Sequence, residues 1–393
     1  MKPTNKVPLR KLVSLLVATL LIPTIASVTG EPPSFQILSY GAIGPVASEG
    51  IAEVTIDGTD FMVNGEPYMF RGVNVQFTGL HHPESGCQSI SRTTFELYEG
   101  WNVNLFRVWL NMEMASPSYG VWDQNFFDDL ELVLDLAEEH GIYLLISGLS
   151  CYNLGPAFGG TGFPSWMFTG ISNQYDGWDI LYKSVVQEDP AYSEIRDAIR
   201  EYYHRVSNII RNRNIVMGYD IFNEPAYRSV PGYSKISASY FYEKLSTYIT
   251  EIDPYKPQAV ENNFIDNNYK PNIPNLFCAP HGYAGHTYIY SFTQMLGYFR
   301  NSDYWVQGPR WNVPTMNGEW FLCKKSEASD YGLTADEIAQ WYDTYITAME
   351  QLGISWAVLR CEASPSNLHW AGSPVREVLH SHWELNIPPP VNG

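Results

Sequence analysis

The chain has 393 residues and a formal net charge of −18; 45% of its residues are hydrophobic and 17% are charged. This composition excludes a disordered chain, and the acidic balance argues against a nucleic-acid partner, which needs a basic patch to neutralise its phosphates. The length suits two average domains or one large α/β barrel with insertions. Aromatic residues reach 15%, which a large core and a carbohydrate-binding cleft would explain equally well.

The first residues have the layout of a secretory signal peptide. Four basic residues stand within the first eleven positions, followed by an apolar run over residues 12–25 and then small residues. A membrane anchor is the alternative, but the run is shorter than the roughly 20 residues of a span, and Pro23 interrupts it. We therefore predict a signal peptide over residues 1–30, a secreted, extracellular protein, and a polar lead-in segment over residues 31–50.

A small hairpin and eight strands are predicted in chain order. The hairpin spans residues 53–63, with Asp57-Gly58 as its turn. The strands are short apolar stretches over residues 68–75, 104–110, 141–147, 215–222, 258–260, 276–280, 313–318 and 354–359. Helical patterns alternate with these strands, and the clearest of them opens at Asp123 and ends at Gly141.

This alternation predicts an α/β fold, a (β/α)8 TIM barrel, as one domain over residues 51–387. A long segment over residues 150–190, rich in glycine and aromatic residues, follows the third predicted strand. Loops of this length inside a compact domain are usually functional or disordered. We predict a wall of the substrate cleft, with an insertion that packs only on the outside of the barrel as the alternative.

Two carboxylates stand where apolar strands end. Glu224 follows the fourth predicted strand, and Glu319 follows the seventh. A single glutamate at a strand end is often a cap or an ion-pair partner. In a parallel barrel, however, both would lie at the carboxyl ends of the strands, where the chemistry of this fold takes place. Two such acids are the minimal equipment for cleaving a glycosidic bond.

Asn223-Glu224-Pro225 and Gly318-Glu319 resemble the motifs of glycoside hydrolase family 5 of clan A. That family contains secreted cellulases, β-mannanases and endoglycoceramidases on a (β/α)8 barrel. The resemblance covers roughly residues 55 to 385. Further segments that carry it are Asn64-Gly65-Glu66-Pro67, Phe70-Arg71-Gly72-Val73-Asn74, Phe106-Arg107-Val108-Trp109 and His281-Gly282-Tyr283.

The resemblance implies a role for each acid. Glu224 would be the acid/base that protonates the leaving oxygen, so its pKa must be held up, which a second nearby carboxylate achieves. Glu319 would be the nucleophile and must stay ionised, for which Arg107 is the natural cation. Arg107 on an apolar strand needs a carboxylate partner even without catalysis, because an unpaired buried charge is costly.

Supporting roles follow from the same resemblance. Asn223 would hydrogen-bond the sugar 2-hydroxyl or satisfy backbone groups at the barrel rim. His281 would orient Glu224 or contact substrate, and the phenol of Tyr283 would donate to Glu319. His281 and Tyr283 could also be ordinary rim residues.

Two departures from the family pattern concern substrate binding. No histidine follows the third strand, where residues 147–151 read Ser-Gly-Leu-Ser-Cys. Near the end of the eighth strand, where many members place a sugar-stacking tryptophan, this chain has Leu359-Arg360. Trp356 stands earlier and either supports substrate binding or faces the core, and Trp370 is the other candidate platform.

The five cysteines show no spacing typical of a metal site, so we predict no metal and no cofactor. Outside the cell they allow one or two disulfides. The sequence as a whole predicts a monomeric, retaining endo-β-glycosidase for a carbohydrate substrate, a β-1,4-linked glucan or mannan. Alternatives are a glycolipid- or short β-glucoside-cleaving enzyme and, since a lectin needs no paired acids, less readily a non-catalytic carbohydrate-binding barrel.

Overall fold

A computed structural model describes residues 51–77, 90–149, 163–171, 174–225, 232–282, 291–320, 333–358 and 374–386. The predicted signal peptide and lead-in segment lie outside these residues. The described chain begins with the predicted hairpin, in which β1 (Val54–Asp57) pairs antiparallel with β2 (Asp60–Val63). Gly58 adopts a φ of 58° in the turn, a conformation that glycine accepts at no steric cost. A short third strand, β3 (Glu66–Pro67), pairs with β2.

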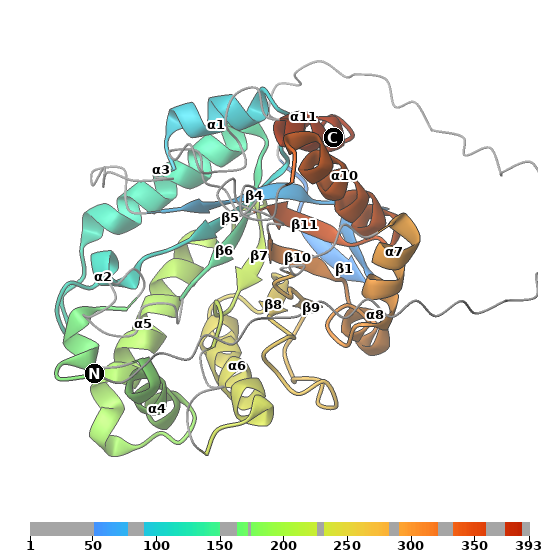
Figure 1. The fold of residues 1–393 in the computed structure, drawn as a ribbon. Helices are drawn as coiled ribbons and strands as arrows, with labels where there is room; N and C mark the ends of the chain where they lie inside the picture. Colours follow the sequence, from blue (N-terminus) through green and yellow to red (C-terminus); the bar gives the residue numbers. More distant parts are fainter. Residues whose placement is uncertain are drawn as a thin grey trace, which may run out of the picture. The chain divides into compact units, whose positions relative to one another are not determined.

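Eight parallel strands form the central sheet (Figure 1). In chain order they are β4 (Arg71–Gln76), β5 (Leu105–Trp109), β6 (Tyr143–Ser147), β7 (Val216–Asp220), β8 (Gln258–Val260), β9 (Leu276–Cys278), β10 (Met316–Trp320) and β11 (Ser355–Val358). Their order in the sheet is β10-β11-β4-β5-β6-β7-β8-β9. Two isolated parallel bridges, Cys278 to Thr315 and His281 to Glu319, join β9 to β10. The predicted (β/α)8 barrel is therefore confirmed.

Helices surround the strands in Figure 1. They are α1 (Arg92–Glu99), α2 (Met112–Ala115), α3 (Gln124–His140), α4 (Gln174–Val185), α5 (Ser193–Ile210), α6 (Lys235–Thr250), α7 (Phe292–Asn301), α8 (Gln307–Trp311), α10 (Ala335–Gln351) and α11 (Pro374–Trp383). Short 3-10 turns lie at η2 (Ser165–Phe168) and η3 (Pro190–Tyr192). Within the described residues, no helix combines the length and apolar character needed to cross a membrane.

Helix α3 has the boundaries that its sequence predicts. The Asp123 side chain accepts a hydrogen bond from the backbone N–H of Asn125, which caps the first turn. Gly141 ends the helix with a φ of 63°, in the left-handed region that glycine favours. The apolar stripe between these two ends is buried, with Leu130 and Val133 fully covered.

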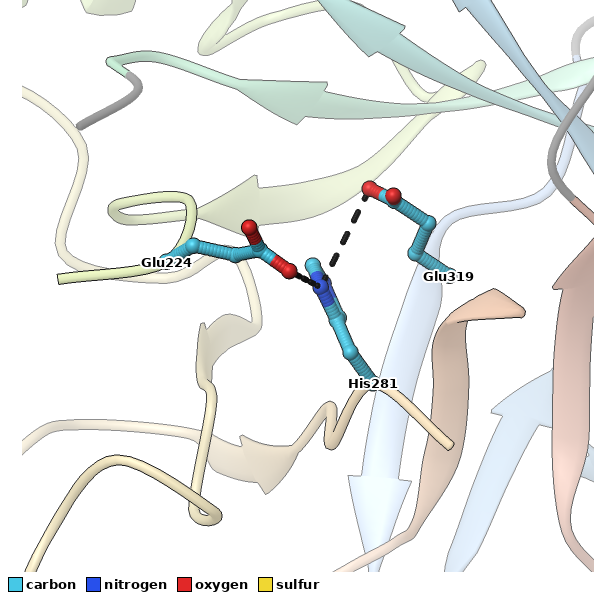
Figure 2. Close-up of side chains that lie close together, drawn as sticks. All are labelled: Glu224, His281 and Glu319. Atoms are coloured by element: carbon cyan, nitrogen blue, oxygen red, sulfur yellow. Dashed lines mark hydrogen bonds and ion pairs between the residues drawn. The ribbon is translucent and has the colours of Figure 1, made fainter. Parts of the chain in front are cut away.

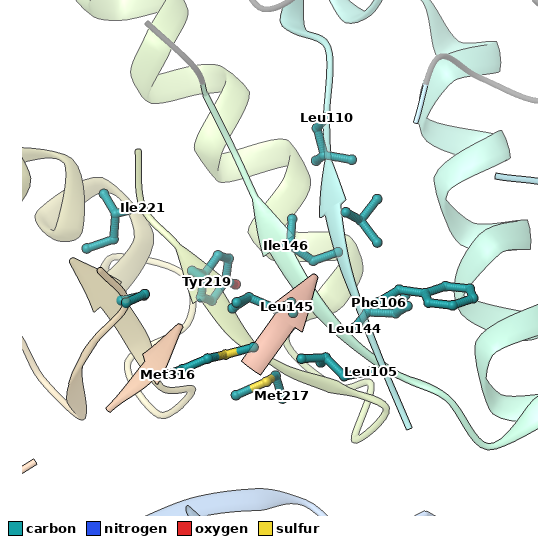
Figure 3. Packing of buried hydrophobic residues seen from close by; sticks show 14 of the residues in the cluster. Leu105, Phe106, Leu110, Leu144, Leu145, Ile146, Met217, Tyr219, Ile221 and Met316 are labelled. Atoms are coloured by element: carbon teal, nitrogen blue, oxygen red, sulfur yellow. The ribbon is translucent and has the colours of Figure 1, made fainter. Parts of the chain in front are cut away.

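Successive side chains of each strand point alternately toward the surrounding helices and toward the inside of the barrel. In β5, Phe106 packs against Phe95 and Tyr98 of α1, on the helix side of the sheet. The next residue, Arg107, points to the opposite face because successive side chains of a strand alternate. Figure 3 shows the apolar packing of side chains from β5, β6 and β7, among them Leu105, Leu145 and Met217. The interior face of the barrel can therefore hold charged groups close to its carboxyl end.

One of the five cysteines lies within the described residues. Cys278, in β9, is buried and carries a free thiol. Burial raises the pKa of this thiol above its ordinary value, so it stays protonated. The remaining four cysteines lie outside the described residues.

Candidate active site

The charged groups of the site gather at the carboxyl end of the barrel. Arg107 lies in β5 and Glu319 in β10, while Glu224, Glu261 and His281 closely follow β7, β8 and β9. Parallel strands place all these positions at one edge of the sheet, which is the catalytic face of this architecture. The chain thus brings five residues from five different strands to one place.

Arg107 is fully buried and surrounded by acceptors. Its guanidinium donates to Asp220 through Nε (2.9 Å) and Nη2, to Asn74 Oδ1 (2.8 Å) and Glu319 Oε2 (3.2 Å) through Nη1, and to Asn223 Oδ1 (2.7 Å) through Nη2. Burial alone would lower the pKa of Arg107. The negative charges of Asp220 and Glu319 outweigh burial and raise this pKa above its ordinary value. Arg107 therefore stays charged beside Asp220 and Glu319.

Figure 2 shows the imidazole of His281 between the carboxylates of Glu224 and Glu319. His281 Nδ1 lies 2.9 Å from Glu224 Oε1 and 3.9 Å from Glu319 Oε2. One oxygen of each glutamate and a ring nitrogen of the histidine all lie within 4.8 Å of one another. The two acids therefore lie on either side of His281 at the carboxyl end of the barrel.

A third glutamate, Glu261, is part of the cluster. It is fully buried, its Oε1 lies 2.9 Å from His281 Nε2, and its Oε2 accepts a hydrogen bond of 2.9 Å from the backbone N–H of Glu224. The sequence analysis missed this residue. The available signal was the same as for Glu224 and Glu319, because Glu261 is an acid directly after a predicted apolar strand, residues 258–260.

The geometry of the cluster favours the cationic form of His281, in which both ring nitrogens are protonated. Burial acts to lower its pKa, but Glu261 and Glu319 outweigh burial and raise the pKa to about 10. Glu224, Glu319 and His281 are also the group, among the described residues, whose donor atoms lie close enough for a metal ion. Both ring nitrogens of His281 face carboxylate oxygens, which favours a ring protonated at both nitrogens.

The structure therefore brings together Glu224, Glu319, Arg107, Asn223 and His281 of the predicted site. It adds Asn74, Asp220 and Glu261 as partners. Tyr283 and Trp370 lie outside the described residues, so their predicted roles stay predictions.

The sequence analysis gave Trp356 either a substrate-binding role or a place in the core, and the structure corrects the first of these alternatives. Its side chain is fully buried and packs between Trp320, at a centroid distance of 5.8 Å, and Trp383 of α11, at 6.2 Å. Its indole N–H donates to Glu350 Oε1 of α10 at 3.4 Å. Trp356 thus packs against the surrounding helices, away from the cluster at the carboxyl end of the barrel.

The long segment after β6 divides into two parts within its described residues. Trp178 of α4 is fully buried and packs on Phe241 of α6 at 4.8 Å, so it belongs to the core. Trp166 of η2 is half-buried; its indole N–H donates to Ser116 O at 3.0 Å, and its ring meets Tyr119 edge-on at 5.4 Å. The cleft-wall interpretation is therefore wrong for Trp178 and remains open for Trp166.

We expect Trp178→Ala to lower the free energy of unfolding by about 3–5 kcal/mol, because it leaves a large cavity in the core. Urea unfolding followed by fluorescence and circular dichroism measures this loss. Trp166→Ala is the matched control, and its half-buried ring should cost clearly less. Equal losses for the two variants would contradict the division of the segment into a core part and a rim part.

Comparisons with known proteins agree with this fold. The family model described as Cellulase (glycosyl hydrolase family 5) matches residues 63–363. A parallel barrel with paired acids at its carboxyl ends is the architecture of a glycoside hydrolase. The chain belongs to glycosyl hydrolase family 5.

Curated relatives match about half of the chain. Mannan endo-1,4-beta-mannosidase 5 of Solanum lycopersicum is 23% identical over 207 residues, 51% of this chain and 48% of the relative. Mannan endo-1,4-beta-mannosidase 4 of Oryza sativa subsp. japonica is 23% identical over 233 residues, 57% of this chain and 47% of the relative. The chain thus spans about half the length of the curated relatives it matches.

Solved structures with a similar fold cover more of the chain. Endo-glycoceramidase II from Rhodococcus sp. superposes with a TM-score of 0.63 at 15% identity, covering 84% of this chain and 80% of that one. The beta-glucanase SdGluc5_26A from Saccharophagus degradans has a TM-score of 0.60 at 15% identity, covering 86% and 97%. At such identities the likeness shows the shared fold.

Proposed function

We propose that the chain is a retaining endo-β-glycosidase with Glu319 as nucleophile and Glu224 as acid/base. The observation that carries this proposal is the pair of carboxylates whose facing oxygens lie within 4.8 Å at the carboxyl end of the barrel. Retaining enzymes hold their two carboxyl groups about 5–5.5 Å apart, whereas inverting enzymes need about 6.5–9.5 Å to admit a water.

The reaction follows from these positions in two steps. In the first, an oxygen of Glu319 attacks the anomeric carbon, the glycosidic C–O bond breaks, and Glu224 gives its proton to the departing oxygen. In the second, Glu224 takes a proton from water, and the water oxygen displaces Glu319 from the anomeric carbon. The charge of Arg107 holds Glu319 ionised before attack and stabilises it again as it departs.

Asn223 is the residue we assign to the sugar. Its Oδ1 accepts from Arg107 Nη2 at 2.7 Å, which fixes the orientation of the amide. In that orientation Nδ2 is the atom we assign to the sugar 2-hydroxyl. A hydrogen bond there strengthens as the transition state forms, which gives it a larger effect on kcat than on KM.

We propose β-1,4-linked mannan as the substrate, with β-1,4-glucan second, because the curated relatives are named as mannan endo-1,4-beta-mannosidases. The test is a panel of mannan, β-glucans, xylan and glucosylceramide, with the products analysed by chain length and by the anomer released first. Internal cleavage of mannan to β-configured ends is the expected result. Release of α-configured ends would contradict the retaining mechanism, and cleavage of glucosylceramide alone would move the substrate to glycolipids.

Trp166 is the candidate for stacking on a sugar away from the scissile bond. It and Tyr119, which is 50% exposed, lie on segments that leave the carboxyl ends of β6 and β5. We expect Trp166→Ala to raise KM for the polymer several-fold, since stacking on a ring contributes about 1 kcal/mol, while hydrolysis of a small aryl glycoside stays unchanged. Kinetics on the two substrates measure the difference. Equal losses on both would assign Trp166 to structure alone.

Export is the remaining part of the proposal. It rests on the basic and apolar pattern of residues 1–30 in the sequence. Expression of the full chain in a secreting host, followed by N-terminal sequencing of the protein in the medium, tests it. A protein that stays attached to the membrane fraction would favour the anchor alternative.

A further inference from the structure

Glu261 is a fully buried carboxylate that the two-step reaction does not use. Three donors surround it. The backbone N–H of Glu224 lies 2.9 Å from Oε2, His281 Nε2 lies 2.9 Å from Oε1, and Arg107 Nη2 lies 3.6 Å from Oε1. Burying a carboxylate costs free energy that an apolar side chain of similar size does not. The hydrogen bond from Glu224 N–H and the two nearby cations offset that cost, and they connect Glu261 to Glu224, His281 and Arg107.

The contact with Glu224 holds an unusual backbone conformation. Glu224 has a φ of 50°, in the left-handed region that residues other than glycine rarely adopt. Residues held in such conformations persist where the surrounding structure fixes them, and they concentrate at functional sites. Here the hydrogen bond from the Glu224 N–H to Glu261 Oε2 fixes the peptide group from which the acid/base side chain departs.

The contact with His281 reaches the other end of the same side chain. His281 lies between Glu261 on its Nε2 side and Glu224 on its Nδ1 side, at 2.9 Å from each. With a proton on both ring nitrogens, His281 donates from Nδ1 to Glu224 Oε1. The other oxygen of Glu224, Oε2, is then the one that carries the proton destined for the leaving group.

Other charged and titratable groups surround the pair, and burial raises the pKa of Glu261 to about 8 against the opposing effect of His281. Arg107, Asp220 and Glu319 contribute charge from β5, β7 and β10. Burial raises the pKa of Tyr242 well above its ordinary value, so its hydroxyl stays neutral beside Glu261. Loss of the Glu261 charge would act on the protonation of His281, whose Nε2 lies 2.9 Å from Glu261 Oε1.

We propose that Glu261 is a positioning residue that fixes the acid/base Glu224 from two directions, through its backbone N–H and, by way of His281, through its carboxylate. This inference rests on the proposed function for the role of Glu224. Glu261, directly after β8, would thereby determine which oxygen of Glu224 donates its proton.

The variant that tests the proposal is Glu261→Gln, which keeps the shape of the side chain and removes its charge. The first measurement is the protonation of His281, followed by nitrogen-15 NMR of the histidine rings, with the His281 signals assigned by their absence in His281→Gln. We expect the wild-type ring to keep both protons at pH 8, because its pKa is raised to about 10. In Glu261→Gln the His281 ring should lose one of its two protons at a pH below 8. Glu261→Asp keeps a carboxylate, so the ring of that variant should again hold both protons at pH 8.

The second measurement compares two aryl β-glycosides of the sugar that the wild type cleaves. Glu261→Gln should lower kcat/KM by about 10²-fold for a poor leaving group, which needs a well-placed proton, and by only a few-fold for dinitrophenolate, which does not. Asp253→Asn is the matched control. Asp253 is a buried acid before the opposite end of β8, where it accepts from the Tyr219 hydroxyl at 2.9 Å. Its loss should lower the melting temperature without any dependence on the leaving group.

Two results would overturn the proposal: an unchanged protonation of His281 in Glu261→Gln, or equal kinetic losses for both leaving groups. A wild type that cleaves no substrate of the panel would refute the proposed function instead. In that case the NMR comparison still decides whether Glu261 controls the proton on His281, because it requires no turnover.

Discussion

Replacement of Glu319 by glutamine is expected to abolish hydrolysis of every substrate, with kcat/KM reduced on the order of 10⁴–10⁶-fold, as for loss of a nucleophile. Glutamine has the shape of glutamate, so Arg107 keeps an acceptor at the position where it now contacts Glu319 Oε2 at 3.2 Å. An uncharged amide, however, is a poor nucleophile toward the anomeric carbon. Initial rates on mannan and on an aryl glycoside measure the loss.

The control for this variant is Glu139→Gln. Glu139 is an exposed surface residue in an ion pair with Arg92, so its substitution should leave activity unchanged. Activity of Glu319→Gln within tenfold of the wild type would remove Glu319 from the mechanism, provided that circular dichroism shows both variants folded.

Glu224→Ala should fail on the polymer yet still form the glycosyl–enzyme from an aryl glycoside whose leaving group needs no proton. The second step then stalls because no base activates water. Azide needs no base, so it should accelerate turnover on the order of 10²-fold and yield a β-glycosyl azide. Product analysis by NMR identifies the anomer.

Glu319→Ala treated in the same way is the matched comparison. With the nucleophile removed, azide would enter from the vacated side and give an α-glycosyl azide. An α-azide from Glu224→Ala and a β-azide from Glu319→Ala would mean that the two roles are reversed. No azide product from either variant would contradict the assignment of both acids.

The barrel was predictable from the sequence because its strands are short, apolar and bounded by turn residues. β8 has the predicted bounds, Gln258–Val260. The seventh predicted strand begins too early, since β10 starts at Met316 and not at residue 313. Pro314 has no N–H to donate to a ladder, although its carbonyl accepts from Cys278 N at 2.9 Å. The first and last residues of a strand depend on which neighbouring strand supplies the hydrogen-bond partners, and the sequence alone does not show that pairing.

The predicted site residues were visible because each charged or polar group interrupts an apolar strand. Their partners were harder to predict. Asn74 lies on the neighbouring strand β4, in register with Arg107, and Asp220 lies on β7, two strands from β5 in the sheet, so the strand order and register place them against Arg107. For Trp356 the sequence left two faces open, and the packing against Trp383 decides for the core. Residue type therefore indicated the chemistry, whereas the pairings required the tertiary structure.

The junction between β9 and β10 has a consequence for how the protein responds to heat. Two isolated bridges join these strands, whereas β4 and β5 are registered over five residue pairs. One of the two bridges joins the backbones of His281 and Glu319. Local opening starts where few backbone hydrogen bonds hold neighbouring elements together. A sparsely paired seam of the barrel thus runs through the cluster of Glu224, His281 and Glu319, so we expect heating to separate His281 from Glu319 while the rest of the fold persists.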